Sequence, residues 1–111
     1  MRYQTRCVKV RLKPQSLERV REWARTLNES RRTEAIATLR DETVVFEAAF
    51  LDQTVEGDFL IYVMKVENLE KSKQAVATST HDIDSYHGAF KSDTWDERKE
   101  LDLLVDLDTR L

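Results

Sequence analysis

Two neighbouring segments, residues 43–52 and 59–66, are nearly apolar on both faces that a β-strand would present. Each segment divides into two alternating sets: Val44, Phe46, Ala48 and Phe50 against Val45, Glu47, Ala49 and Leu51, then Phe59, Ile61 and Val63 against Leu60, Tyr62 and Met64. Strands of this kind have to be covered on both sides. Residues 55–58 lie between them and contain Gly57, which predicts a turn. The pair predicts a sheet with two buried faces.

The N-terminal half supplies a strand and two helices. Residues 5–13 alternate between apolar and polar side chains and end at Pro14, which predicts a strand. Ser16 is a candidate N-cap for a helix whose apolar stripe recurs at helical spacing. The stripe loses phase near Asn28, which predicts a break over residues 28–31 and a second short helix to about Leu39.

The C-terminal half predicts two more helices and a last strand. Asn68 is a candidate cap for a helix over residues 69–78, and residues 81–92 predict another short helix. Trp95 is expected in a loop, and the stretch 96–99 is turn-like. The alternating run 101–108 predicts the final strand.

The resulting order, βαββαβ, predicts an α+β chain with the ferredoxin-like split βαβ fold and a four-stranded antiparallel sheet. We expect one domain over residues 1–111. Helices cover one sheet face only, and the expected open face is too apolar for water: Val45, Ala49, Leu51, Leu60 and Met64. A patch of this size usually marks an interface. The sequence therefore predicts a homodimer that packs sheet on sheet and encloses a cavity.

Several segments also resemble known proteins. Residues 8–14 (VKVRLKP), followed by 17–23 (LERVREW), are similar to the first strand and helix of the dimeric α/β-barrel superfamily. That group includes antibiotic-biosynthesis-type monooxygenases, muconolactone isomerases and rhamnose mutarotases. Through residues 57–62 (GDFLIY), 81–87 (HDIDSYH) and 101–105 (LDLLV), nearly the whole chain resembles a small prokaryotic family of unknown function within it. The resemblance implies a fold and a dimer, and carries over no site residue.

Charge and composition limit the kinds of partner and the cellular location that we expect for this chain. The 18 Lys and Arg stand against 21 Asp and Glu, a net charge of −3, which argues against nucleic-acid binding. No apolar run approaches the roughly 18 residues of a membrane span, and the first residues lack a signal-peptide pattern. One cysteine, Cys7, cannot form an intramolecular disulfide. We therefore expect a cytoplasmic protein.

Four side chains are candidates for acid–base chemistry: Glu47, Tyr62, His81 and His87. The two histidines are six residues apart, about 240° around a helix, so they do not point at one ion. We expect no metal site and no cofactor, and haem binding through His87 is the remote alternative. The structural interpretation, in which His81 or Asp82 helps to start a helix and Tyr86 and His87 pack its inner face, is favoured.

The ligand-binding candidates are Lys9, Arg11, Glu47, Tyr62 and Trp95. If the strands alternate without interruption, the first four share the open face with Cys7 and Asp106, while Trp95 lies at the rim. In one interpretation Lys9 and Arg11 hold a small anion in the inter-sheet cavity. In the other, the cations pair with Glu47 and Asp106 across strands or across the dimer.

Two function classes stay open. The first is an uncharacterised homodimer that binds a small molecule in the inter-sheet cavity. The second is a cofactor-free enzyme of the isomerase, mutarotase or monooxygenase type that uses acid–base residues on the sheet face.

Overall fold

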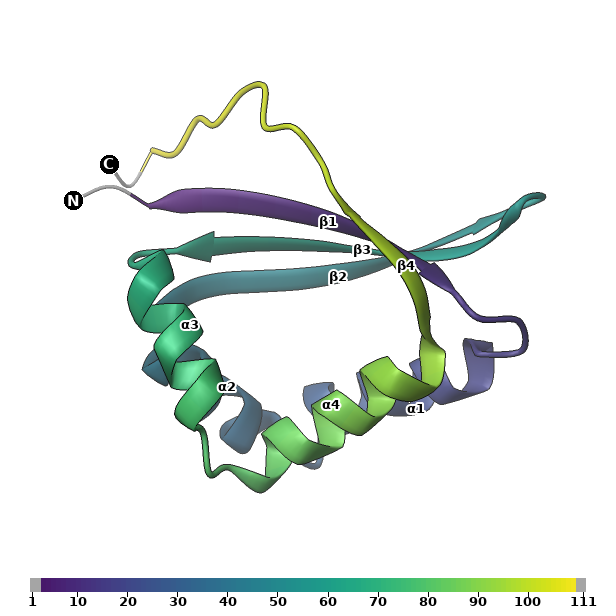
Figure 1. Ribbon diagram of the computed structural model, residues 1–111, viewed down its shortest axis with the longest axis horizontal. Coiled ribbons are helices and arrows are strands. Elements are labelled where there is room, and N and C mark those ends of the chain that lie inside the picture. The colour runs from purple at the N-terminus through teal and green to yellow at the C-terminus, as the bar shows by residue number, and fades with distance from the viewer. Residues whose placement is uncertain (1–2, 110–111) are drawn as a thin grey trace.

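The first strand, β1 (Gln4–Leu12), buries Val8, Val10 and Leu12 on one face and turns Lys9 and Arg11 to the other, as the alternation predicts. The structure is a computed structural model, and it describes residues 3–109. The other elements are α1 (Leu17–Asn28), α2 (Arg32–Asp41), β2 (Val44–Thr54), β3 (Gly57–Val66), α3 (Leu69–Thr78), α4 (Asp82–Thr94) and β4 (Trp95–Glu100). Figure 1 shows one sheet with all four helices on the same side of it.

The four strands form one antiparallel sheet in the order β2-β3-β1-β4. Val10 lies opposite Leu60 and Val8 opposite Tyr62, so these four side chains share the face that the helices cover. β2 and β3 are joined by a tight hairpin in which Gly57 has a φ of +136°. This positive φ is a conformation that side-chain-bearing residues rarely adopt, so the hairpin favours glycine at this position.

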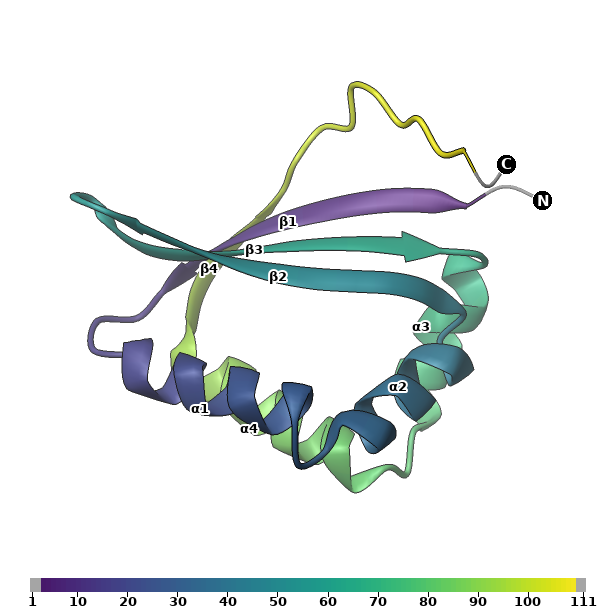
Figure 2. The same cartoon turned by 180° about the vertical axis from the view of Figure 1, so that it is seen from behind.

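The hydrophobic core lies under one end of the sheet. Its buried members are Val8, Val10, Leu12, Val20, Trp23, Leu60, Tyr62 and Phe90. The rings of Trp23 and Phe90 are stacked with their centroids 4.4 Å apart, which joins α1 to α4. In Figure 2, α1 and α4 run side by side beneath this end, while α2 and α3 stand beneath the other. The side chains between the sheet and α2 and α3 are therefore not part of this core.

The helix boundaries largely follow the sequence. The break near Asn28 is confirmed, because α1 ends there and α2 begins at Arg32. Asn68 caps α3 as predicted, since its Oδ1 accepts a hydrogen bond of 3.0 Å from the backbone N–H of Lys71. Ser16 occupies the N-cap position of α1, but its side chain makes no capping hydrogen bond.

The predicted faces of β2 and β3 are wrong. Leu60 and Tyr62 are buried on the helix side, and Glu47, opposite Met64, lies on that side too. The outer face instead carries Phe46, Ala48, Phe50, Phe59, Ile61 and Val63. Two causes act together: both faces are apolar, so burial alone does not choose between them, and a β-bulge at Val45 shifts the register. The open face is apolar, but through the other set of residues.

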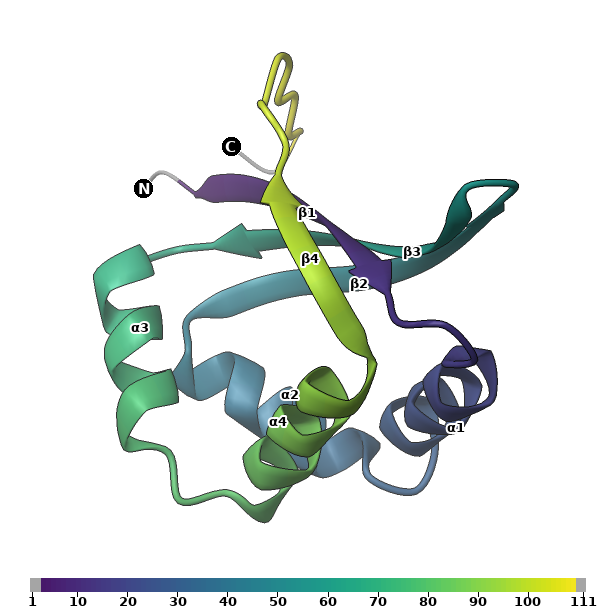
Figure 3. The same ribbon diagram turned by 45° about the vertical axis from the view of Figure 1, so that its right-hand side comes forward.

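The prediction for the last strand is also wrong. Trp95 begins β4 rather than lying in a loop, and residues 101–108 form no strand. Within residues 3–109, β4 is an edge strand that pairs with β1 alone, so its backbone hydrogen bonds hold it although its side chains are nearly all charged. Figure 3 shows the following residues leaving the sheet on the side away from the helices.

Candidate functional site

A cavity of about 260 Å³ lies between α2, α3 and α4. It is lined by Thr38, Asp41, Glu42, Ala75, Thr78, Ser79, Thr80, His81 and Asp84. Two of its acids are already engaged: Asp41 Oδ2 lies 2.8 Å from His81 Nε2, and Asp84 accepts a hydrogen bond from the Ser79 hydroxyl. The cavity is therefore small, polar and acidic.

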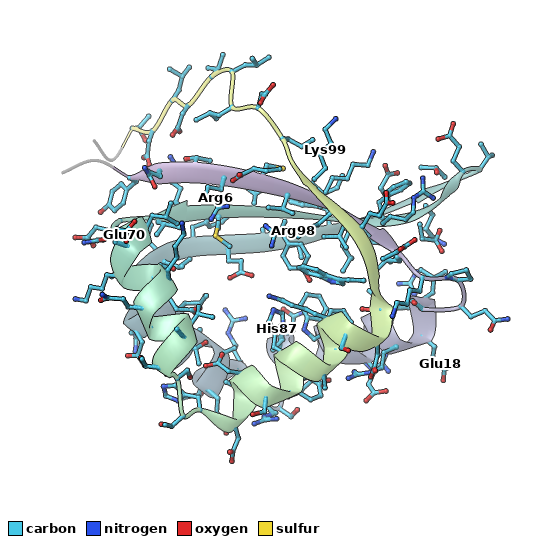
Figure 4. All side chains as sticks on the ribbon, viewed as in Figure 1. Arg6, Glu18, Glu70, His87, Arg98 and Lys99 are labelled. Carbon is cyan, nitrogen blue, oxygen red and sulfur yellow. The ribbon has the colours of Figure 1, made fainter. Side chains whose placement is uncertain are left out.

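Five side chains from β2, β3, α4 and β4 interact with one another on the helix side of the sheet: Glu47, Tyr62, His87, Lys91 and Trp95. We call them the inner polar cluster. Rings of Tyr62 and Trp95 lie edge to face at 5.5 Å, and Lys91 Nζ is 4.9 Å from the centre of the Trp95 ring. Figure 4 shows His87 pointing from α4 toward the sheet.

Two buried polar atoms in this cluster, Tyr62 Oη and Trp95 Nε1, have no hydrogen-bond partner among residues 3–109. Tyr62 is only 5% exposed. The Trp95 N–H is close enough to favour the Tyr62 phenolate, but burial and the charge of Glu47 outweigh it and raise the Tyr62 pKa. Leaving a buried donor unpaired costs about 1–3 kcal/mol, so these two donors are the polar atoms of the cluster that would gain most from an acceptor.

His87 is fixed as a neutral hydrogen-bond donor. Its Nδ1 accepts a hydrogen bond of 3.0 Å from Trp23 Nε1, and the two rings are stacked at 5.7 Å. Burial, and then the positive charge of Lys91, lower its pKa to about 4. Because Nδ1 is an acceptor, the proton of the neutral ring sits on Nε2.

The remaining charges of the cluster are also perturbed. Burial raises the pKa of Glu47, with Lys91 opposing the shift, and burial lowers the pKa of Lys91, with Glu47 opposing it. Burial, followed by the negative charges of Asp84 and Glu47, raises the pKa of Glu42 to about 7. Glu42 lines the cavity, so electrostatic coupling links the cavity to the inner polar cluster.

The structure separates the candidates chosen from the sequence. Glu47, Tyr62, His87 and Trp95 come together on the helix side, whereas Lys9 and Arg11 lie on the outer face beside the Phe59 ring. The expectation that Lys9, Arg11, Glu47 and Tyr62 share one face is therefore wrong, since Val8 and not Lys9 lies opposite Tyr62. Asp106 does reach the outer face, but from beyond β4, where it bonds Thr5 and Lys65.

His81 is not part of the inner polar cluster and lines the cavity instead. It precedes α4, is exposed, and pairs with Asp41, whose hydrogen bond raises the His81 pKa. It starts the helix without a side-chain cap. Among the described residues, no group of three or more His, Cys, Asp and Glu is arranged to hold a metal ion.

Two charged residues of the candidate site and the neighbouring cavity, Glu42 and Lys91, were not predicted from the sequence. A usable signal exists for Lys91, because Asp84, His87 and Lys91 are spaced three and four apart and therefore share one face of α4. Glu42 follows the end of α2, and nothing in its spacing marks it.

Within residues 3–109, the helices are all too short or too polar to cross a lipid bilayer. No curated protein matches this chain. A family model does match it over residues 3–110, and its description is a family of unknown function. Since the match spans nearly the whole sequence, the chain belongs to this family of unknown function, DUF6176.

Proposed function

We propose that the protein binds a small molecule that presents a carbonyl or carboxylate oxygen to the inner polar cluster. The observation that carries this proposal is a pair of buried donors that find no partner in the described part of the chain, Tyr62 Oη and Trp95 Nε1. An oxygen with two lone pairs can accept from both and remove the cost of leaving them unpaired. Lys91, which makes no ion pair among the described residues, supplies compensating positive charge if the ligand is a carboxylate.

The proposed site differs from the inter-sheet cavity expected from the sequence. It lies within one protomer, between the sheet and α4, and its Lys91 interacts electrostatically with Glu42 and Asp84, which line the cavity. Hydroxyl groups and acids of that cavity suit a ligand whose remainder is polar. Lys9 and Arg11 are not part of this site, because they lie on the opposite face of the sheet.

Tyr62→Phe tests the proposal. In the free protein the change raises the free energy of unfolding by about 1 kcal/mol, because it removes a buried hydroxyl that has no partner. The same change weakens the binding of carbonyl and carboxylate probes about tenfold. Thermal unfolding and calorimetric titration measure both effects, with acetate, benzoate, phenylacetate and phenylacetone as probes and benzyl alcohol as the control without a carbonyl.

Two outcomes contradict the proposal. One is that none of the carbonyl or carboxylate probes stabilises the wild-type protein more than benzyl alcohol does. The other is that Tyr62→Phe binds every probe as tightly as the wild type does.

A second function, proton transfer, is favoured by one observation: Glu47 has a raised pKa and lies in the cluster that holds Tyr62 and Lys91. In this cofactor-free reaction Glu47 removes a proton beside a carbonyl group, and Tyr62 donates a hydrogen bond to the carbonyl oxygen. Deuterium exchange at the carbon between the ring and the carbonyl of phenylacetone, followed by NMR, measures it. Exchange that is absent, or unchanged in Glu47→Gln, leaves binding as the function.

We further propose that the protein has the ferredoxin-like arrangement and forms a cytoplasmic homodimer through the outer face of its sheet, as dimeric α/β barrels do. The strand order β2-β3-β1-β4 supports the arrangement. The exposed aromatic side chains of that face, Phe46 at 48% and Phe50 at 59%, support the dimer, since patches of this kind usually mark interfaces. A sedimentation mass of twice the 13.0 kDa of one chain is expected at micromolar concentration.

A further inference from the structure

The segment after β4, residues 101–109, forms an arch above the outer face of the sheet. At its start, the arch is attached to β1 by a hydrogen bond of 2.8 Å from the Leu101 N–H to the Cys7 carbonyl. Near its end, it is attached to β3 by two ion pairs, since Lys65 Nζ lies 2.8 Å from Asp106 and 3.0 Å from Asp108. Figure 3 shows the chain rising away from the sheet after β4. We call residues 101–109 the C-terminal arch.

The arch displays its apolar side chains to solvent. Leu103, Leu104, Val105 and Leu107 are 55%, 90%, 72% and 89% exposed. They do not rest on the sheet of their own chain, although Asp106 and Asp108 hold the arch close to it. Ion pairs at one end of the arch keep these four large apolar side chains exposed, and such a surface is typical of one that another molecule covers.

Charges on the outer face indicate what that molecule carries. Lys9 lies directly opposite Lys99 in the pairing of β1 with β4, and Figure 4 shows Lys99 on the opposite side of the sheet from Arg98. Like charges placed opposite each other on neighbouring strands are unfavourable. Within the described part of the chain, neither lysine belongs to an ion pair. The face therefore suits an apolar partner that brings a carboxylate.

The C-terminal arch has both properties. Besides its four apolar side chains it carries Asp102, which is exposed and makes no ion pair or hydrogen bond to the described residues. A second copy of the chain would therefore present leucines to the aromatic side chains Phe46 and Phe50 and a carboxylate to Lys9 and Lys99. In a two-fold dimer each arch meets the face of the other copy, so every contact is made twice.

We propose that the C-terminal arch is the element that holds two copies together, with its leucines on the partner's outer sheet face and Asp102 beside the cations there. This inference rests on the proposed dimer and names the segment that makes it. It also assigns Lys9 a role in the interface rather than in ligand binding.

Sedimentation equilibrium of the full chain tests the inference with three variants. Leu104→Asp weakens the dimer at least tenfold, because it places a charge on the apolar surface of the arch. Val76→Asp, on the exposed face of α3 at 60% exposure, leaves the dimer unchanged and is the matched control. Asp102→Lys weakens the dimer, and adding Lys99→Asp to it restores part of the loss, because the charges are then exchanged.

The outcomes separate this inference from the proposed dimer. A wild-type mass near 13.0 kDa overturns both. A wild-type dimer that Leu104→Asp does not weaken, while Phe50→Asp does, overturns the arch and keeps the dimer. A lower melting temperature of Leu104→Asp with an unchanged mass also overturns the inference, since it shows that the arch folds onto its own sheet.

Discussion

Phe90→Ala lowers the free energy of unfolding by about 3–5 kcal/mol, the usual cost of truncating a fully buried phenylalanine. Phe90 is 0% exposed and stacks on Trp23, so the alanine leaves a cavity at the contact between α1 and α4. A domain of this size is typically stable by roughly 5–15 kcal/mol, so the loss is a large part of the total. Urea unfolding measures it as a lower midpoint.

Val76→Ala is the control for this prediction. Val76 is 60% exposed on α3, and the same kind of truncation there changes stability by less than about 0.5 kcal/mol. A Phe90→Ala variant as stable as Val76→Ala contradicts the assignment of the core to β1, β3, α1 and α4.

The second large effect is a pH dependence caused by His87. The pKa of His87 is about 4 in the folded protein and roughly 6.5 in the unfolded chain. The unfolded state therefore takes up the proton first, and stability that is complete above pH 6.5 is lost as the pH falls toward 4. The shift corresponds to roughly 3 kcal/mol.

Comparison with His87→Gln isolates this effect. The glutamine can still accept the hydrogen bond from Trp23 Nε1, but it does not titrate. The stability advantage of the wild type over His87→Gln therefore shrinks by roughly 3 kcal/mol between pH 7.5 and pH 4. Glu42, with a pKa of about 7, changes stability in the opposite direction, but it is present in both proteins and cancels in the difference.

His81 provides a control of opposite sign. Its pKa is raised by Asp41, so its stabilising contribution is present at low pH and lost as the pH rises through the folded pKa. The stability advantage of the wild type over His81→Gln is therefore largest at low pH and shrinks as the pH rises. A constant difference between wild type and His87→Gln across the range would show that His87 titrates as it does in water.

The sequence predicts those parts of the fold in which one face is clearly polar. β1 alternates apolar side chains with cations, and Asn68 can cap only the helix that follows it, so both predictions are confirmed. β2 and β3 offer no such choice, because either face can be buried. Here the register decides, and the pairing of Val10 with Leu60 is a contact between residues far apart in the chain.

The same limit applies to the candidate site. Tyr62 and Glu47 could be chosen by residue type, but their side of the sheet follows from the register and from the bulge at Val45. The prediction of a strand at the end of the chain was wrong for another reason. Residues 101–108 have the alternation of a strand, yet they find no strand partner among the described residues, and the charged segment before them pairs with β1 instead.

The bulge at Val45 also bears on how this family can diverge over evolution. The bulge lets β2 carry one extra residue, so deleting Val45 would restore regular pairing and leave Val44 opposite Val66 and Phe46 opposite Lys65. Glu47 and Phe50 would keep their sides of the sheet, because the tight hairpin fixes the register of the rest of β2. A one-residue gap at residues 44–46 between members of the family would therefore mark loss of the bulge rather than a change in the faces of β2.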